Sequence, residues 1–388
     1  IGLLAGSIVL LTLRKTGFLV GVSLILSGTG LVKSNLAAHV GAISSSSSKT
    51  AGNYNFFFVG MVLGATAGPA IFGFFVQKHL WYIGFWVTAA GALSSLLISI
   101  PLLNFRLLIL KDSMKKQLGV LLGFIAFTGF IYFLLNHSKN SLLVVSIVVI
   151  AVLLYLMFTG LKATKQEKLN VVYILLLSAF CLAHLLATLQ LDGSFISFAQ
   201  NHLNHKILGW QVPTLEFSSI DPLSAMVFSQ ALGFLWPYLQ SKKGISPTPQ
   251  IKILLGTVFS TLALLLVSYI SSSSTIAENG TSVWFLILAN TLIGLGDAFI
   301  LPTMMAAVSN YAPKNLKGTL MGVWFLVNAL AGIIAGVIVR PSNSTLSVLP
   351  MDSLHKAFII IFAILLVNAI LIAVISPLLK RLKTSSPL

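Results

Sequence analysis

Charged residues are scarce in this chain of 388 residues. Asp, Glu, Lys and Arg make up 8% of it, whereas a typical soluble domain is about 25% charged. Hydrophobic residues make up 57%, and only 8 residues are acidic, against 24 Lys and Arg. This composition excludes an ordinary soluble domain and is typical of an integral membrane protein with many helical spans.

Cysteine is nearly absent as well, which excludes two kinds of site. The single Cys181 cannot form an internal disulfide or a cysteine-based metal site. The H-E-x-x-H, G-x-S-x-G and P-loop motifs are also missing, so the sequence does not indicate an enzyme and predicts no cofactor or metal.

The net charge of +16 could suggest a nucleic-acid partner. However, the basic residues are scattered through short loops between apolar runs. Most of them fall on the side of the membrane that holds loop 106–116. Basic residues gather on cytoplasmic loops of membrane proteins. We therefore expect the lipid bilayer rather than nucleic acid as partner, a multi-pass location in the cell (inner or plasma) membrane, and both ends of the full-length protein in the cytoplasm.

Long apolar runs divide the rest of the chain. At about 20 residues each they are too long for strands, so they predict membrane-spanning helices. A further run at 1–13 is too short to span, so we expect a helix that begins upstream of residue 1. With that partial run, twelve helices are predicted. The full runs are 17–43, 54–76, 81–105, 117–136, 141–161, 169–190, 220–240, 251–271, 283–309, 316–339 and 355–378.

Two charges interrupt these runs, Lys33 and Asp297. A charge at the centre of a spanning helix costs roughly 2.5–3.5 kcal/mol on insertion scales, so it usually faces a partner, a cavity or a substrate. One is basic and one acidic, which predicts a site for a ligand charged at both ends. The alternatives are a snorkelling lysine and an aspartate that hydrogen-bonds a neighbouring helix.

Glycines lie beside both charges. Gly28 and Gly30 precede Lys33, and Gly294 and Gly296 precede Asp297. They indicate either close packing of helices through small residues or a flexible, broken helix near a site at the membrane midplane. The sequence leaves both interpretations open.

Four segments resemble motifs of one transporter family, in family order. They are GTGLVKSNLAAHVG, AGNYNFFFVGMVLGATAGP, QVPTLEFSSIDPLSAM, and LIGLGDAFILP followed by YAPKNLKGTLMGVWFLVNALAG. Together they resemble the proton-dependent oligopeptide transporters, a branch of the major facilitator superfamily. The resemblance implies an all-α membrane protein with two helical bundles around a central cavity. In that frame, residues 1–105 are the remainder of the N-terminal bundle, 106–168 a linker with two extra helices, and 169–388 the C-terminal bundle. The first two helices of the family fold would be lacking.

The resemblance also implies a function: uptake of di- and tripeptides, driven by protons, through alternating access in a monomer. Lys33 matches the family's cavity lysine, and Asp297 stands at its cavity glutamate. Asp221 stands at a peptide-binding Asn, for which the alternative is a helix N-cap before a proline. Trp324 matches a pocket wall, for which simple packing is the alternative, and Gln190 matches the last residue of the family's FEQ motif.

Besides Asp297 and Asp221, the chain departs from the family pattern at three more matched positions. Leu189 replaces the coupling Glu of FEQ, and Phe58 and Val62 replace a Tyr and an Asn. A carboxyl group in a low-dielectric cavity favours its neutral form, while a nearby lysine favours the charged form. Asp297 is therefore the candidate for proton coupling.

These losses leave other functions open. The alternatives are a transporter of amino acids or drugs with altered coupling, and a non-transporting remnant. His39 and His184 are interpreted as packed or lipid-edge histidines rather than as proton relays.

Overall fold

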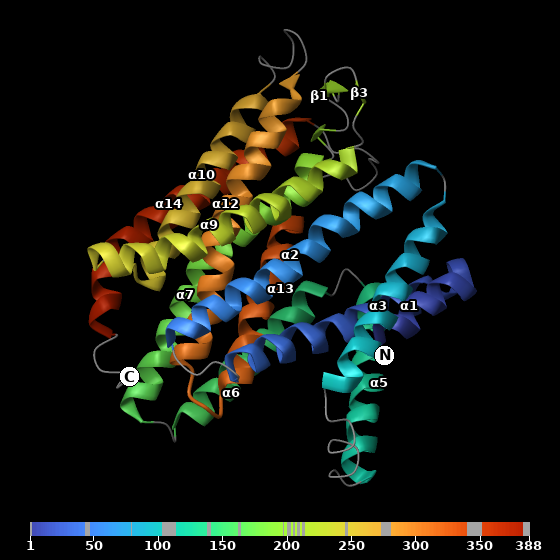
Figure 1. Cartoon of the computed structure of the whole chain (residues 1–388), viewed down its shortest axis with the longest axis horizontal. Coiled ribbons are helices and arrows are strands. Elements are labelled where there is room, and N and C mark those ends of the chain that lie inside the picture. Colours follow the sequence, from blue (N-terminus) through green and yellow to red (C-terminus); the bar gives the residue numbers. More distant parts are fainter. Residues whose placement is uncertain are drawn as a thin grey trace. The chain divides into compact units, whose positions relative to one another are not determined.

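Helices account for almost all of the described chain. The structure, a computed structural model, describes residues 2–42, 47–78, 80–102, 114–137, 141–161, 164–196, 198–199, 203–204, 206–207, 210–211, 214–244, 247–272, 281–339 and 351–382. The long helices are α1 (Gly2–Ala42), α2 (Ser47–Gln77), α3 (Trp81–Leu102), α5 (Met114–Asn136), α6 (Ser141–Leu161), α7 (Lys165–Gln190), α9 (Ile220–Lys243), α10 (Pro249–Ile270), α12 (Val283–Tyr311), α13 (Lys317–Val339) and α14 (Met351–Leu382) (Figure 1).

These helices confirm the predicted apolar runs, with ends that differ by a few residues. Seven helical segments of the described chain are long and apolar enough to cross a membrane, and they lie in α1, α5, α7, α10, α12, α13 and α14. Shorter apolar stretches lie in α2, α3 and α6.

The helix α1 contains two of the predicted runs and reverses direction between them. A Cβ added at Gly6 would lie 2.5 Å from the carbonyl oxygen of Gly21 and 2.7 Å from Cγ1 of Ile25. In a straight helix Gly6 and Gly21 would be about 22 Å apart, at 1.5 Å per residue. The chain therefore doubles back, which agrees with separate runs at 1–13 and 17–43.

The connection between α7 and α9 contains short helices and short strands. A π-helical turn, η2 (Leu191–Phe195), extends α7, and a 3₁₀ helix, η3 (Thr214–Ser219), leads into α9. Three strands of two residues each lie in this connection, and a fourth, β4, lies directly before α12. β1 (Leu203–Asn204) pairs in parallel with β4 (Thr281–Ser282), and β2 (Lys206–Ile207) pairs antiparallel with β3 (Trp210–Gln211). They form no larger sheet within the described residues, so the all-α class holds.

The chain divides into two compact units. The first comprises Ile1–Leu36 and Ile71–Ala151, and the second Ala37–Ala70 and Val152–Leu388. In the second unit, α10 packs between α12 and α14, α12 also contacts α9, and α7 contacts α10, α12, α13 and α14 (Figure 1). The division into an N-terminal bundle, a linker and a C-terminal bundle stays a prediction.

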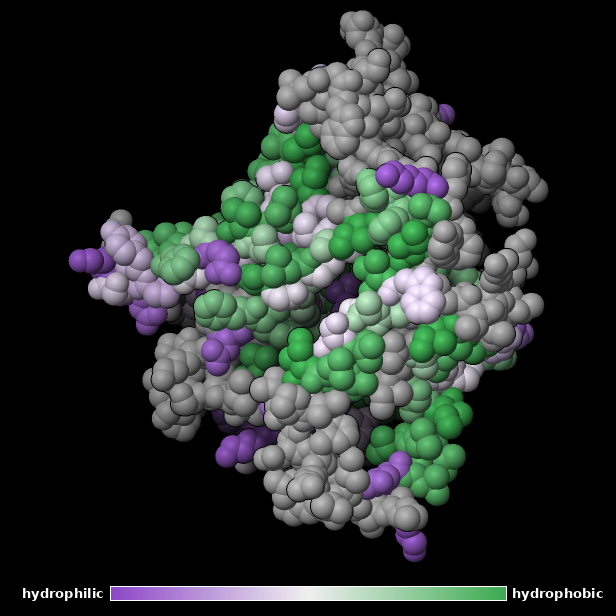
Figure 2. Space-filling view, turned by 45° about the vertical axis from the view of Figure 1, so that its right-hand side comes forward, coloured by the Kyte–Doolittle hydropathy of each residue, from purple (hydrophilic) through white to green (hydrophobic). Residues whose placement is uncertain are grey.

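The surface carries many large apolar side chains. Phe234 is 76% exposed and Val374 is 66% exposed. On the face seen in Figure 2, hydrophobic residues cover much of the described surface, with hydrophilic side chains between and beyond them. Such a surface is unfavourable in water but suits contact with lipid tails, as expected for a multi-pass membrane protein.

Candidate functional site: a buried His–Asp pair

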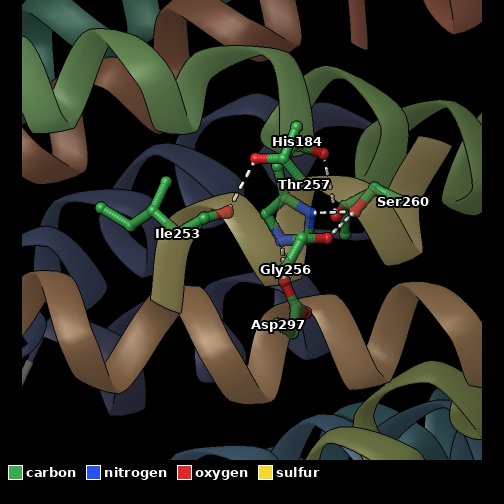
Figure 3. A network of polar contacts seen from close by, with 7 residues as sticks. His184, Ile253, Gly256, Thr257, Ser260 and Asp297 are labelled. Atoms are coloured by element: carbon green, nitrogen blue, oxygen red, sulfur yellow. Dashed lines mark hydrogen bonds and ion pairs between the residues drawn. The ribbon is translucent and has the colours of Figure 1, made fainter. Parts of the chain in front are cut away.

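Three helices of the second unit each contribute one side chain to a buried polar network. His184 comes from α7, Ser260 from α10 and Asp297 from α12. Nε2 of His184 lies 2.6 Å from Oδ1 of Asp297, and Nδ1 lies 2.6 Å from Oγ of Ser260 (Figure 3). His184 and Ser260 are fully buried, and Asp297 is 8% exposed. An ionisable pair is therefore held away from solvent among three helices.

Two glycines give the network its space. A Cβ added at Gly296 would lie 2.8 Å from Oγ of Ser260 and 3.0 Å from Cε1 of His184. A Cβ at Gly256 would lie 2.6 Å from Cγ1 of Ile300 and 2.9 Å from the carbonyl oxygen of Gly296. The helices α10 and α12 thus approach closely because both positions lack a side chain.

The glycines before Asp297 therefore serve close packing. The helix α12 runs unbroken from Val283 to Tyr311 through Gly294 and Gly296. A Cβ at Gly294 would clash with the carbonyl oxygen of Asp221 on α9. Of the two interpretations left open by the sequence, the structure supports close packing here. At Gly30 in the first unit, an added Cβ would meet no atom within 4 Å.

The hydrogen bonds of Ser260 restrict where protons can lie. Its hydroxyl donates to the carbonyl oxygen of Gly256 at 3.0 Å. A hydroxyl has one proton, so in this arrangement Nδ1 of His184 donates to Oγ of Ser260. The contact between Nε2 and Asp297 then needs one more proton, which either the imidazole or the carboxyl group carries. In both cases the pair has no net charge.

Loss of that proton leaves a second fully bonded arrangement. Ser260 can rotate its hydroxyl to donate to Nδ1 of His184, while Nε2–H donates to the carboxylate of Asp297. The carbonyl oxygen of Gly256 keeps its ordinary bond within the helix. The network then carries one negative charge. It can therefore gain or release a single proton without leaving a buried polar group of the three side chains unbonded, which would cost about 1–3 kcal/mol.

Serine, histidine and aspartate also form the catalytic set of many hydrolases. In those enzymes the serine must reach a substrate carbonyl. Ser260 is fully buried within α10 and bonded to Gly256. The arrangement therefore suits proton binding rather than nucleophilic attack.

The backbone of Asp221, a predicted site residue, contacts the helix that carries Asp297. It is buried in the first turn of α9, and its carbonyl oxygen packs against Gly294, one turn before Asp297. The N-cap of α9 is Ser219, so the alternative in which Asp221 itself caps the helix is wrong. A carboxylate in a first helical turn is still favoured by the helix dipole.

Gln190 and Trp324 lie elsewhere in the same unit. Nε2 of Gln190 donates to the carbonyl oxygen of Ala335 at 2.8 Å and so connects α7 to α13. Gln190 is buried, and its Oε1 has no hydrogen-bond partner among the described residues. Trp324 on α13 is buried in the hydrophobic core of the unit. Their roles in binding substrate stay predictions.

Lys33 belongs to the first unit, where its side chain is exposed on α1. Asp297 belongs to the second unit, so a cavity shared by the two charges stays a prediction. Among the departures from the family pattern, Phe58 and Val62 are buried in the core of the second unit. Leu189 packs against that core, with Cδ1 3.7 Å from the position of a Cβ added at Gly332.

Sequence reasoning did not identify the partner of Asp297. The sequence favours a packed or lipid-edge role for His184; the side chain is fully buried, and it also bonds the aspartate. The available signal was a histidine in the middle of an apolar run, six residues before Gln190. Residues 113 positions apart can be paired only once the packing of α7 against α12 is known.

Comparisons with known proteins agree with the fold and the motifs. The sequence profile of the POT family matches residues 4–352. The peptide transporter YePEPT of Yersinia enterocolitica is 25% identical over 83% of this chain and 67% of its own length. A dipeptide and tripeptide permease B of Aeromonas hydrophila is 29% identical over 69% of this chain and 54% of its own length.

Solved structures of transporters share the fold. The crystal structure of a mutant peptide transporter POT in complex with alafosfalin has a TM-score of 0.75 and 22% identity. The match covers 99% of this chain and 79% of that one. The fold is therefore the all-α membrane fold of the major facilitator superfamily. Because the family profile matches most of the sequence, this chain belongs to the POT family.

Proposed function

We propose that this protein carries di- and tripeptides across the cell membrane together with protons, by alternating access. Membership of the POT family and the names of its relatives support the peptide substrates. The observation that carries the proposal is the buried contact between His184 and Asp297. It provides a proton-binding site in a chain whose FEQ-like motif has Leu189 in place of the glutamate.

Coupling would follow from the two charge states of the network. With its proton, the pair of His184 and Asp297 has no net charge. Without it, Asp297 is a carboxylate that can attract the ammonium group of a peptide. In a symport cycle the pair would bind its proton on the outer side, keep it while the peptide crosses, and release the proton on the cytoplasmic side. Lys33 would attract the peptide carboxylate, in line with the family resemblance, while Asp221, Gln190 and Trp324 would shape the rest of the site.

The test of this function is uptake into proteoliposomes. With an imposed proton gradient, acidic outside, wild-type protein should accumulate labelled dialanine, and a protonophore should abolish the accumulation. Unlabelled di- and tripeptides should compete, whereas free alanine should not. Competition by alanine alone would favour an amino-acid transporter. Absence of any gradient-driven uptake of peptide, amino acid or cationic dye would favour a non-transporting protein.

The proposed orientation places both ends of the full-length protein in the cytoplasm. It predicts that cysteines introduced by Ser141→Cys and Thr281→Cys are labelled by an impermeant thiol reagent applied to intact cells. A cysteine introduced by Lys383→Cys, a position outside the described residues, should be protected. The native Cys181 is buried and provides a low background. Labelling at position 383 in intact cells would overturn the orientation.

We also propose that the transporting unit is a monomer in the inner or plasma membrane.

A further inference from the structure

A polar cavity lies at the N-terminal end of α10. Its volume is about 200 Å³, and it is lined by the C-terminal half of α9, the first turn of α10 and the C-terminal half of α12. Pockets for drug-sized ligands are usually about 300–1,000 Å³. This cavity therefore fits a small group rather than a peptide. Its polar lining comes from Thr248, Lys252, Thr303, Asn310 and Tyr311.

Lys252 supplies the charge of this cavity. It lies in the first turn of α10, with Nζ 5.1 Å from the ring centroid of Trp236. The N-terminus of a helix carries a partial positive charge, so a lysine is unfavourable there. The first turn of α10 contains no acidic residue, and Lys252 has no ion pair among the described residues. The partial positive charge of the helix N-terminus and the ammonium group of Lys252 thus lie close together, with no acidic side chain in that turn.

Thr248 supplies a second, independent sign of a ligand. It is the N-cap residue of α10, but its side chain forms no capping hydrogen bond. Its hydroxyl oxygen is buried and has no hydrogen-bond partner within the described part of the chain. A buried hydroxyl without a partner costs free energy. An acceptor oxygen in the cavity would accept bonds from both Thr248 and Lys252.

The apolar part of the lining includes Leu232, Trp236, Ala298 and Pro302. Trp236 also contacts Phe299 at 6.0 Å between ring centroids. Tryptophan side chains are common at the boundary between lipid tails and headgroups. The predicted orientation places this end of α10 on the cytoplasmic side of the membrane. The cytoplasmic leaflet carries anionic lipids. An anionic headgroup could therefore enter the cavity from the side.

We propose that this cavity binds a phosphate group, presented either by an anionic phospholipid or as free inorganic phosphate. The ammonium group of Lys252 pairs with the phosphate, and the hydroxyls of Thr248 and Thr303 and the amide of Asn310 donate to its oxygens. Trp236 and the neighbouring apolar side chains contact the glycerol or the first part of the acyl chains. This site is separate from the His184–Asp297 pair, and the proposal does not rest on the transport function.

The test is thermal unfolding of the purified protein in detergent at constant ionic strength. The additions are inorganic phosphate, dihexanoyl phosphatidylglycerol and dihexanoyl phosphatidylcholine. The anionic lipid, the phosphate or both should raise the unfolding temperature, and the zwitterionic lipid should raise it much less. Lys252→Gln should weaken the apparent affinity by at least about tenfold, because a hydrogen-bonded ion pair is lost. Thr248→Val should weaken it by a smaller factor.

The matched control is Lys242→Gln, which removes an exposed lysine near the end of α9 that does not line the cavity. It should bind as the wild type does. A response to phosphatidylglycerol alone identifies the lipid as the source, and a response to phosphate alone identifies the free anion. The proposal is overturned if no anion stabilises the wild type. It is equally overturned if Lys252→Gln and Lys242→Gln weaken binding to the same extent, which would indicate general attraction to a basic surface.

Discussion

Asp297→Asn should reduce gradient-driven dipeptide uptake to the level seen without a gradient. The side chain introduced cannot bind and release a proton, so the network is held in its uncharged state. Its amide can donate to Nε2 of a neutral His184, which keeps the hydrogen bonds of the protonated network. The variant should therefore fold and unfold at a temperature close to that of the wild type. Uptake into proteoliposomes and thermal unfolding in detergent measure the two properties separately.

Exchange of labelled for unlabelled peptide at equal pH is the informative companion measurement. Exchange needs no net proton movement, so Asp297→Asn should retain it, with weaker binding of peptides that have a free amino terminus. The matched control is Asp352→Asn, at an exposed position in the first turn of α14, which should behave as the wild type. If Asp297→Asn keeps wild-type gradient-driven uptake, Asp297 is not the coupling acid.

Gly294→Ala should strongly destabilise the protein. The added Cβ would overlap the backbone carbonyl of Asp221 and lie 2.7 Å from Cβ of Ser224. A backbone carbonyl cannot rotate away as a side chain can, so α9 and α12 would have to separate. Overpacking of this kind typically costs about 1–3 kcal/mol. The unfolding temperature of the purified protein should therefore fall clearly below that of the wild type.

Gly322→Ala is the control for this change. Gly322 lies in α13, and a Cβ added there would meet no atom within 4 Å. Its unfolding temperature should stay at or above the wild-type value, because alanine favours helix more than glycine does. Equal stability of Gly294→Ala and the wild type would show that α9 and α12 are not packed as closely as described.

Much of the architecture could be predicted because the membrane restricts it. Apolar runs of about 20 residues are too long for the strands of a membrane barrel, which leaves helices. The helices α9, α10, α12 and α13 begin and end within a few residues of the predicted runs. Even the reversal within α1, at an interval of basic residues between two apolar runs, follows the pattern.

The site could be predicted only in part. The cost of burying a charge indicated that Asp297 faces a partner, a cavity or a substrate. The structure shows the alternative, a hydrogen bond to a neighbouring helix, and the role in a cavity stays a prediction. The cost of burial did not identify His184, because the pairing depends on how α7 and α12 are rotated toward each other. Gly294 and Gly296 left two interpretations open, since helix packing and helix breaking use the same residue. Ser260 gives no signal in the sequence, because serine is common in spanning helices and its neighbours decide what it bonds. Thr248 gives none either, because a threonine before a helix is an ordinary N-cap residue.

The most direct test of coupling is proton movement driven by peptide. Proteoliposomes with the wild-type protein, a pH-sensitive dye inside and no imposed pH gradient should receive dialanine outside. The lumen should then acidify, because each peptide that enters brings protons with it. The acidification should disappear with Asp297→Asn while peptide exchange remains. Uptake of dialanine by the wild type without acidification of the lumen would contradict proton coupling at the His184–Asp297 pair.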